Sequence, residues 1–215
     1  MKIHPNSTLV MIGDSITEWG REKPIREDTL GSLGDGYVHF VHCLIAAADP
    51  TLRLQILNMG VGGNTVRNLA ARWEQDVLGR DREWLSIMIG INDVWRHFDP
   101  AVPKGEQISV EEFTGTLERL IKKTRLQLRG LVLMTPYYVE PDRTDPMRVR
   151  MDRFGEAVRG LASKYQAELV DTQAAMDFAL REYSPAELAD DRVHVNAIGH
   201  MILARAFLKA VDFSW

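Results

Sequence analysis

Short apolar runs alternate with segments of helical spacing along this 215-residue chain, and the alternation limits the folds it can adopt. We interpret as strands the runs Leu9–Ile12, Leu54–Leu57, Leu85–Ile91, Leu131–Met134 and Glu168–Val170. Several of these runs are continuously apolar, which is typical of strands covered on both faces. Strands that alternate with helices predict an α/β fold, with a parallel sheet of about five strands between layers of helices.

The segments between the runs place apolar residues on one face of a helix. Phe113, Leu117 and Ile121, for example, recur at near-helical spacing. We expect helices at Tyr37–Ala48, Thr65–Val77, Val110–Gln127 and Met147–Tyr165, and a last helix that Asn196 caps and that runs through Leu208. We expect loops, and hence the rim of a site, at Arg21–Gly36, Phe98–Gln107 and Glu140–Pro146.

The length of the chain predicts one domain over residues 1–215. A chain of this length buries roughly 70% of its unfolded surface, so it needs no disulfide or metal to fold.

The net charge is −4 with both signs interspersed, which argues against a nucleic-acid partner. The single cysteine, Cys43, lies in an apolar stretch and is expected in the core. No secretory leader opens the chain, and no apolar run reaches the ~20 residues of a membrane helix. We therefore expect a cytoplasmic protein without a membrane partner.

Four groups of polar or glycine residues follow the ends of predicted strands. Ser15 follows the first run, the cluster Asn58–Thr65 the second, Gly90–Asp93 the third and Thr135–Tyr138 the fourth. In parallel α/β sheets, ligands bind beyond the carboxyl ends of the strands, which meet at one edge. The sequence therefore predicts a site at that edge.

Ser15 and His194 are candidates for a nucleophile and its base. A serine hydroxyl is a poor nucleophile until a neighbouring base takes its proton, and histidine suits that role. Asp191 precedes His194 by three residues, and a carboxylate at this position can fix the tautomer of the ring. Asp190 is the rival for the acid, and we favour Asp191. Taken alone, Ser15 could cap a helix and His194 could be a surface residue, but together with Asp191 they favour a hydrolase. Asp14 is expected to brace the serine turn by hydrogen bonds.

The remaining groups have alternative interpretations. The glycine cluster could bind phosphate, or the N–H of Gly63 could stabilise an oxyanion. The cluster lacks the Gly-Lys-Ser/Thr of a P-loop. Asn92 could cap a turn or supply a second oxyanion donor. Asp191, His194 and His200 could be metal ligands, but no further ligand has a familiar spacing, so we expect no metal.

These blocks resemble those of the GDSL esterases, also called SGNH hydrolases. Gly13-Asp14-Ser15-Ile16 matches the serine block, with Ile16 in place of leucine. Gly63 and the asparagine Asn92 match the second and third blocks, and Asp191-x-x-His194 matches the last. The blocks occur in order and span nearly the whole chain.

The resemblance implies a three-layer, flavodoxin-like fold and no cofactor. It implies that Ser15, Asp191 and His194 are catalytic and that the backbone of Ser15 and Gly63 and the side chain of Asn92 bind the oxyanion. One departure is Val195, because many members of the family have proline after the histidine.

Further stretches resemble bacterial intracellular acetylxylan esterases within this family. They are Gly62–Val66, Ser86–Trp95, Leu133–Pro136, Asp145–Met147, Asp171–Ala175 and Gly199–Phe207. This resemblance implies a serine esterase that removes acetyl groups from xylo-oligosaccharides, with an acetylated sugar as its small-molecule partner. The alternatives are a general short-chain carboxylesterase, thioesterase or lysophospholipase of the same family, and a non-catalytic module that binds an anion at Gly60–Thr65.

Aromatic residues suggest where a sugar would bind. Trp95 and Tyr138 follow the third and fourth strands and are candidates for stacking on substrate, as is Trp19; the alternative is that these rings pack loops onto the core. Trp73 and Trp84 are expected in the core. The chain ends in Phe213-Ser214-Trp215, and an aromatic end favours docking on its own domain or on a partner subunit. We therefore expect a homo-oligomer.

Overall fold

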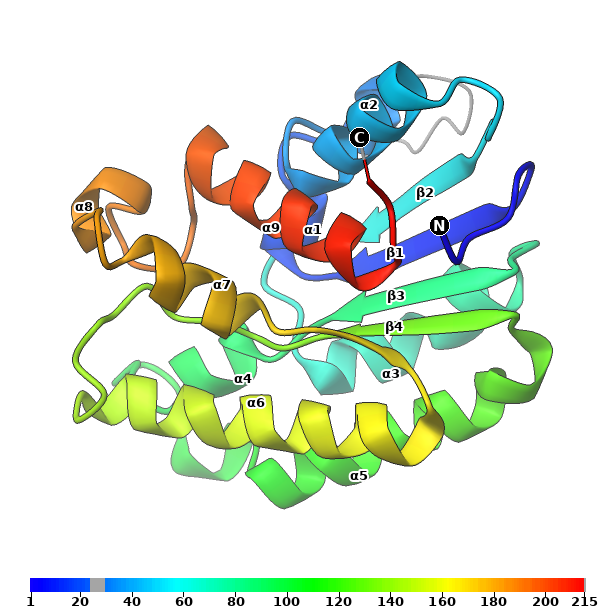
Figure 1. The fold of residues 1–215 in the computed structure, drawn as a ribbon. Coiled ribbons are helices and arrows are strands. Elements are labelled where there is room, and N and C mark those ends of the chain that lie inside the picture. The colour runs from blue at the N-terminus through cyan, green and yellow to red at the C-terminus, as the bar shows by residue number, and fades with distance from the viewer. Residues whose placement is uncertain (24–29, 215) are drawn as a thin grey trace.

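Five parallel strands form one sheet in the order β2-β1-β3-β4-β5. Figure 1 labels β1 to β4. The computed structural model describes residues 1–23 and 30–214. The central part of the expected Arg21–Gly36 loop and the expected docking of Trp215 lie outside these residues. The strands are β1 (Thr8–Gly13), β2 (Gln55–Gly60), β3 (Trp84–Met88), β4 (Gly130–Met134) and β5 (Glu168–Val170). The predicted α/β class and the number and order along the chain of the strands are confirmed.

Helices cover both faces of the sheet and give three layers (Figure 1). Helices α2 (Tyr37–Ala48), α7 (Thr172–Ala179) and α9 (Ala197–Ala210) pack together on one face. Helices α3 (Val66–Trp73), α5 (Val110–Thr124) and α6 (Pro146–Tyr165) lie on the other. The short helices are α1 (Ser15–Glu18), α4 (Ile91–Trp95) and α8 (Pro185–Leu188). Turns of 3₁₀-helix occur at Leu30–Leu33, Lys104–Glu106 and Arg125–Gln127, and a π-helix at Glu74–Leu78.

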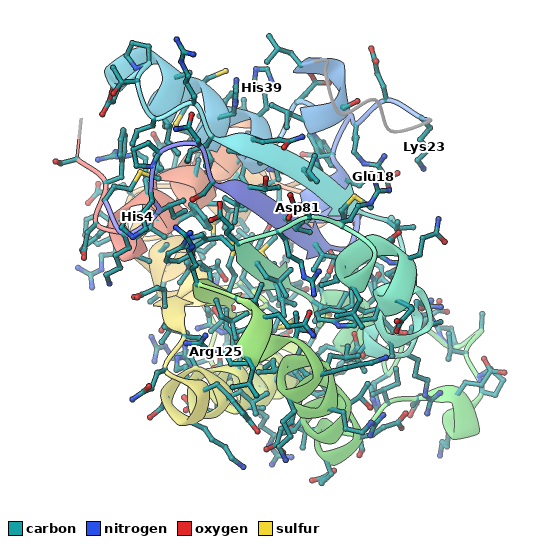
Figure 2. All side chains as sticks on the ribbon, turned by 90° about the vertical axis from the view of Figure 1, so that its right-hand side faces the viewer. His4, Glu18, Lys23, His39, Asp81 and Arg125 are labelled. Atoms are coloured by element: carbon teal, nitrogen blue, oxygen red, sulfur yellow. The ribbon has the colours of Figure 1, made fainter. Side chains whose placement is uncertain are left out.

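The carboxyl ends of the neighbouring strands β2, β1 and β3 are level with one another. Gly13, the last residue of β1, pairs with Gly60 at the end of β2 and with Met88 at the end of β3. The connections that leave these strands therefore start side by side. Figure 2 views the sheet from the amino ends of the strands, where Asp81 and Arg125 precede β3 and β4.

The central strands are fully buried, as continuous apolar runs require. All residues of β3 and β4 are buried, and the expected core tryptophans Trp73 and Trp84 are 1% and 5% exposed. The edge strand β5 is more open. Cys43 departs from expectation, because it is half-buried on α2 with its Sγ 3.2 Å from Nε2 of His39.

The third strand is shorter than predicted, because it ends at Met88 rather than at Ile91. Gly90 has a φ of 132°, which residues with a side chain rarely adopt, and it turns the chain into α4. Ile89 and Ile91 are both buried, so their apolar character did not distinguish strand from turn. Asn92 consequently lies on a short helix.

Other boundaries also differ from expectation. The segment expected as one helix over Thr65–Val77 is α3 followed by the π-helix, and the expected Val110–Gln127 helix ends at Thr124 and tightens into a 3₁₀ turn. Helices α7 and α8 were not predicted. The last helix begins after Asn196, whose side chain accepts from the N–H groups of Ile198 and Gly199 as predicted, and it runs on to Ala210. Within the described residues, no helix has both the length and the apolar character needed to cross a bilayer.

We predict that Gly90→Ala lowers the free energy of unfolding by about 1–3 kcal/mol, the cost of a residue held in a sparsely populated backbone region. The added Cβ would also lie 3.0 Å from Cγ of Pro136. Gly160→Ala is the control, because Gly160 lies exposed inside α6 with nothing within 4 Å of a Cβ. It should leave stability unchanged or raise it by up to about 1 kcal/mol. Urea unfolding measures both, and equal stabilities of the two variants would contradict the account.

Candidate active site

Ser15, His194 and Asp191 form a continuous chain of hydrogen bonds, although they lie at opposite ends of the sequence. Oγ of Ser15 lies 2.9 Å from Nε2 of His194. The other ring nitrogen, Nδ1, lies 2.6 Å from Oδ2 of Asp191. Of the two aspartates considered for the acid, Asp191 makes this contact. The structure thus brings together the residues predicted as nucleophile, base and acid.

The carboxylate of Asp191 sets the proton position on the histidine. Partial burial acts to raise the pKa of Asp191, but hydrogen bonds from the His194 ring and from the backbone of His194 and Val193 outweigh it, so the pKa lies below its usual value. An ionised carboxylate only accepts hydrogen bonds, so we assign the proton to Nδ1 of His194. Nε2 then presents its lone pair to the Ser15 hydroxyl, as a general base must.

The turn that carries the histidine is held by its own aspartate. Oδ1 of Asp191 accepts from the N–H groups of Val193 at 2.9 Å and of His194 at 2.7 Å. Arg192 lies inside this turn with a φ of 62°, a left-handed conformation uncommon for a residue with a side chain. The strained residue is therefore adjacent to the predicted catalytic pair.

The loop after β4 fixes the same turn from outside. The hydroxyl of Tyr137 donates to the carbonyl of Val193 at 3.0 Å, and the N–H of Val139 donates to the carbonyl of Arg192 at 2.9 Å. Val195, where the resembled family often has proline, is fully buried. The turn is thus held by hydrogen bonds and packing without that proline.

Ser15 is the first residue of α1 and follows β1 after a single residue, Asp14. The Asp14 side chain caps α1 by accepting from the N–H of Ile16 at 3.0 Å, as the sequence suggested. Asp14 is only 1% exposed. Burial raises the pKa of Asp14 to about 7. The hydrogen bond from the N–H of Ile16 acts to lower this pKa, and the nearby Asp93 acts to raise it further.

Gly63 and Asn92 lie in the connections that follow β2 and β3, the two strands that pair with β1. Gly63 has a φ of 74°, and a Cβ on the preceding Gly62 would lie 3.8 Å from Cβ of Ser15, so this loop lies against the serine. Nδ2 of Asn92 donates to the carbonyl of Asn64 at 3.0 Å. A side-chain amide carries two hydrogens, so this bond anchors the group and leaves the second hydrogen to donate elsewhere.

Asp93 ties the start of α3 to α4 and was not singled out from the sequence. Its carboxylate accepts from the N–H of Val66, with distances of 3.0 and 3.3 Å to the two oxygens. Asp93 is fully buried, and burial raises its pKa to about 7. An acidic residue inside an apolar stretch is the one sequence signal that could have indicated this role.

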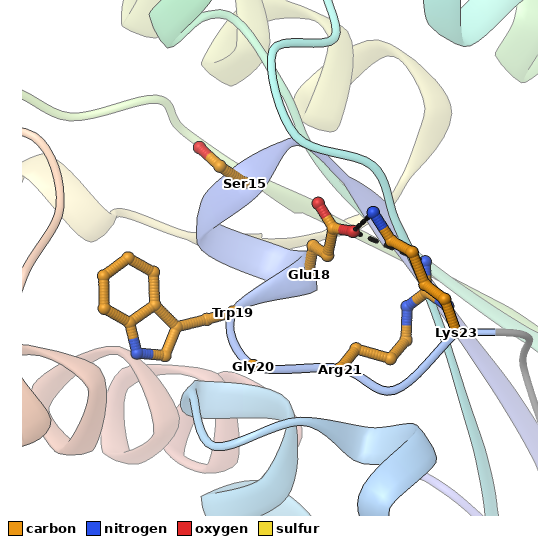
Figure 3. Close-up of a pocket in the computed structure, with 6 residues that line it drawn as sticks. All are labelled: Ser15, Glu18, Trp19, Gly20, Arg21 and Lys23. Carbon is orange, nitrogen blue, oxygen red and sulfur yellow. Dashed lines mark ion pairs between the residues drawn. The ribbon is translucent and has the colours of Figure 1, made fainter.

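Glu18 joins the serine turn to the glycine loop and was also missed. Oε2 of Glu18 accepts from the N–H of Gly62 at 2.5 Å, and Oε1 pairs with Lys23 and lies 4.0 Å from Arg21. Burial acts to raise the pKa of Glu18, but Lys23 and the Gly62 N–H lower it below its usual value. Glu18, Arg21, Lys23 and Ser15 line a hollow of about 450 Å³. Figure 3 shows their side chains.

The ring of Trp19 packs between two histidines. Its centroid lies 5.8 Å from that of His194, with an interplanar angle of 24°, and 5.2 Å from that of His200. His200 is 1% exposed and accepts from the N–H of Tyr37 through Nδ1 at 3.2 Å. Burial, together with His194, lowers the pKa of His200 to about 4. Trp19, a candidate for sugar stacking, therefore lies between a neutral buried ring and the imidazole of His194.

The candidate substrate residues follow the carboxyl ends of β3 and β4. Trp95 is 39% exposed at the end of α4, three residues after Asn92. Tyr138 is half-buried in the loop after β4, where its N–H donates to Oε1 of Gln173 at 2.8 Å. Within residues 1–23 and 30–214, no three histidine, cysteine, aspartate or glutamate side chains are grouped as metal ligands would be.

Comparison with known proteins reveals similarity over the whole chain. A sequence model of the GDSL-like lipase/acylhydrolase family matches residues 11–202. The chain is 47% identical to an acetylxylan esterase of Geobacillus stearothermophilus, covering 100% of this chain and 98% of that protein.

Solved structures are similar to the same extent. The crystal structure of Axe2, an acetylxylan esterase from Geobacillus stearothermophilus, superposes with a TM-score of 0.97 at 47% identity, covering 100% of this chain and 98% of that chain. LAE5, an α/β hydrolase from the metagenome of Lake Arreo, has a TM-score of 0.96 at 45% identity over 99% and 98% of the two chains. Three further Axe2 structures are described as catalytic mutants, with alanine in place of a serine, an aspartate or a histidine.

The buried Asp14 predicts a pH dependence of stability. Its pKa in the folded protein, about 7, lies above that of the unfolded chain, so the neutral form is favoured by folding. The corresponding stability is fully present below about pH 4 and is lost as the pH rises through about 7. The side chain of Asp14→Asn stays neutral at every pH and keeps an oxygen that can accept from the N–H of Ile16. Between pH 4 and 8, the free energy of unfolding should therefore fall less in Asp14→Asn than in the wild type, by up to about 4 kcal/mol.

Urea unfolding at intervals from pH 4 to 8 measures this difference. Asp190→Asn is the exposed control and should follow the wild-type slope. Parallel curves for the wild type and Asp14→Asn would show that Asp14 does not carry the effect.

Proposed function

Because the chain belongs to the GDSL-like lipase/acylhydrolase family, we propose that it is a serine esterase that removes acetyl groups from acetylated xylo-oligosaccharides. The observation that carries the proposal is the hydrogen-bonded chain of Ser15, His194 and Asp191. The acetylxylan esterase that is 47% identical over the full length supports the choice of substrate.

In the first step of the proposed reaction, Nε2 of His194 takes the proton of the Ser15 hydroxyl as Oγ attacks the acetyl carbonyl carbon. Negative charge then develops on the carbonyl oxygen. The N–H groups of Ser15 and Gly63 and the free hydrogen of the Asn92 amide donate to this oxygen, while Asp191 stabilises the imidazolium.

Collapse of this intermediate breaks the ester bond. His194 returns its proton to the departing sugar hydroxyl, which leaves the acetyl group on Oγ of Ser15. A water molecule then loses a proton to His194 and attacks the acetyl carbon, and acetate leaves as Ser15 recovers its proton. This sequence needs no cofactor.

The mutants of the related esterase support this assignment of roles. The three Axe2 structures described as catalytic mutants carry alanine at its positions 15, 191 and 194. Serine, aspartate and histidine occupy the same numbers in this chain.

The sugar partner is proposed to stack on Trp95, at the end of α4, and on Tyr138, in the loop after β4. A general short-chain esterase, thioesterase or lysophospholipase would use the same catalytic residues with different partners. A panel of acetylated xylo-oligosaccharides and simple esters of rising acyl length separates these functions, because only the first prefers the acetylated sugar over an acetyl ester without one.

The proposal includes a cytoplasmic location and self-association. The location rests on the composition and on the single Cys43, which has no cysteine partner in the chain. Self-association is supported by the exposed apolar side chains Leu169, Phe178 and Ile198, which line a groove formed by β5, α7 and α9.

Ser15→Ala tests the proposed nucleophile. We predict a loss of turnover of several orders of magnitude on acetylated xylo-oligosaccharide, because members of a triad act as a unit. A serine-directed phosphonate should label the wild type at Ser15 and leave Ser15→Ala unlabelled. A non-catalytic module would show no labelling, and near-normal turnover in Ser15→Ala would remove the serine from its role.

Asn92→Ala tests the proposed side-chain donor to the oxyanion. Loss of one such donor should lower kcat by about 10²–10³-fold, with little change in KM, because the bond strengthens as charge develops. Steady-state kinetics on the acetylated sugar measure both constants. A decrease in kcat of less than about threefold would make Asn92 only a structural residue.

A further inference from the structure

The guanidinium of Arg72 connects three segments at the carboxyl edge of the sheet. Arg72 lies on α3, and its side chain is 15% exposed. Nη2 donates to the carbonyl of Gly13 at 2.8 Å, at the end of β1. Nη1 donates to the carbonyl of Met59 at 2.7 Å, near the end of β2. Nε donates to Oδ1 of Asn64 at 2.7 Å, in the glycine loop.

The contacts with Gly13 and Asn64 lie within two residues of proposed oxyanion donors. Gly13 is two residues before Ser15, and Asn64 directly follows Gly63. The backbone carbonyl of Asn64 accepts from Nδ2 of Asn92 at 3.0 Å. One cation thereby links the supports of all three donors.

The guanidinium of Arg72 is itself held by a carboxylate. Asp76, one helical turn later, accepts from Nη1 at 2.7 Å, and its side chain is 13% exposed. Asp76 lies in the π-helix Glu74–Leu78, a rare backbone form that is frequent near functional sites. The planar fork of arginine can serve several acceptors at fixed angles, whereas a lysine ammonium is a compact point charge.

We propose that Arg72 is a positioning residue that holds the oxyanion donors in place, an inference that rests on the proposed esterase function. Oxyanion donors act only when they are already aimed at the position where charge develops. A misplacement of about 1 Å can cost about 10²-fold in rate. Because the contacts of Arg72 are with protein groups, its loss should lower kcat rather than weaken substrate binding.

The test compares Arg72→Gln and Arg72→Lys with Arg125→Gln in steady-state hydrolysis of p-nitrophenyl acetate and acetylated xylo-oligosaccharide. Arg125 is a matched control, because it also donates to backbone carbonyls, those of Tyr165 and Leu128, but at the opposite edge of the sheet (Figure 2). We expect Arg72→Gln to lower kcat by about 10²-fold and Arg72→Lys by about tenfold, with KM within threefold. Arg125→Gln should stay within threefold of the wild type. A kcat within threefold in folded Arg72→Gln would overturn the proposal.

Asn64→Ala provides a second test that does not require Arg72→Gln to fold. It removes the acceptor of Nε but keeps the backbone carbonyl that holds Asn92, and Asn64 is only half-buried. We expect kcat of Asn64→Ala to fall by about tenfold. In a double variant with Arg72→Gln or Arg72→Lys, the loss in kcat should be smaller than the product of the two separate losses, because both substitutions act through one contact. A kcat within threefold in Asn64→Ala, or fully multiplicative effects, would contradict the proposal.

Ser15→Ala, assayed in parallel, distinguishes failure of the positioning role of Arg72 from failure of the proposed esterase function. If Ser15→Ala retains activity, the proposed esterase mechanism is wrong, and the positioning role falls with it. If Ser15→Ala is inactive while the Arg72 variants keep their kcat, only the positioning role is wrong.

Discussion

The parallel register of β2, β1 and β3 is the constraint on which the site depends. Backbone pairing places Gly13 between Gly60 and Met88, so three connections leave the sheet at one level. The serine, the glycine loop and the asparagine therefore start from neighbouring points, each within a few residues of its strand. The histidine turn is brought to the same edge by the helix that follows it and by hydrogen bonds from the loop after β4.

The parts of the fold that depend on local chemistry could be predicted from the sequence. A strand covered on both faces must be apolar throughout, so β1, β3 and β4 were located within a few residues of their true bounds. Helix α2 was predicted at Tyr37–Ala48, as observed. Asn196 could be predicted as a helix cap because its side chain accepts hydrogen bonds from N–H groups only two and three residues later in the sequence. Ser15, Asp191 and His194 stood out because their chemistry and spacing are unusual together.

The features that the sequence did not indicate depend on distant partners or on competing apolar signals. Glu18 and Arg72 are ordinary polar residues in the sequence, and their contacts with Gly62 and Gly13 exist only once the strands have paired. The end of β3 was missed because a buried turn is as apolar as the strand before it. Trp19 was considered for the sugar, since nothing in its neighbours indicates that folding places it against His194.

We propose that folding assembles residues from both ends of the chain into one acyl-transfer site. A crystal structure of the protein inactivated by an acyl-mimicking phosphonate tests it most directly. We expect phosphorus bonded to Oγ of Ser15, with the phosphonyl oxygen about 2.7–3.1 Å from the backbone nitrogen of Gly63 and from Nδ2 of Asn92. Attachment at another residue, or a phosphonyl oxygen turned away from both donors, would contradict it.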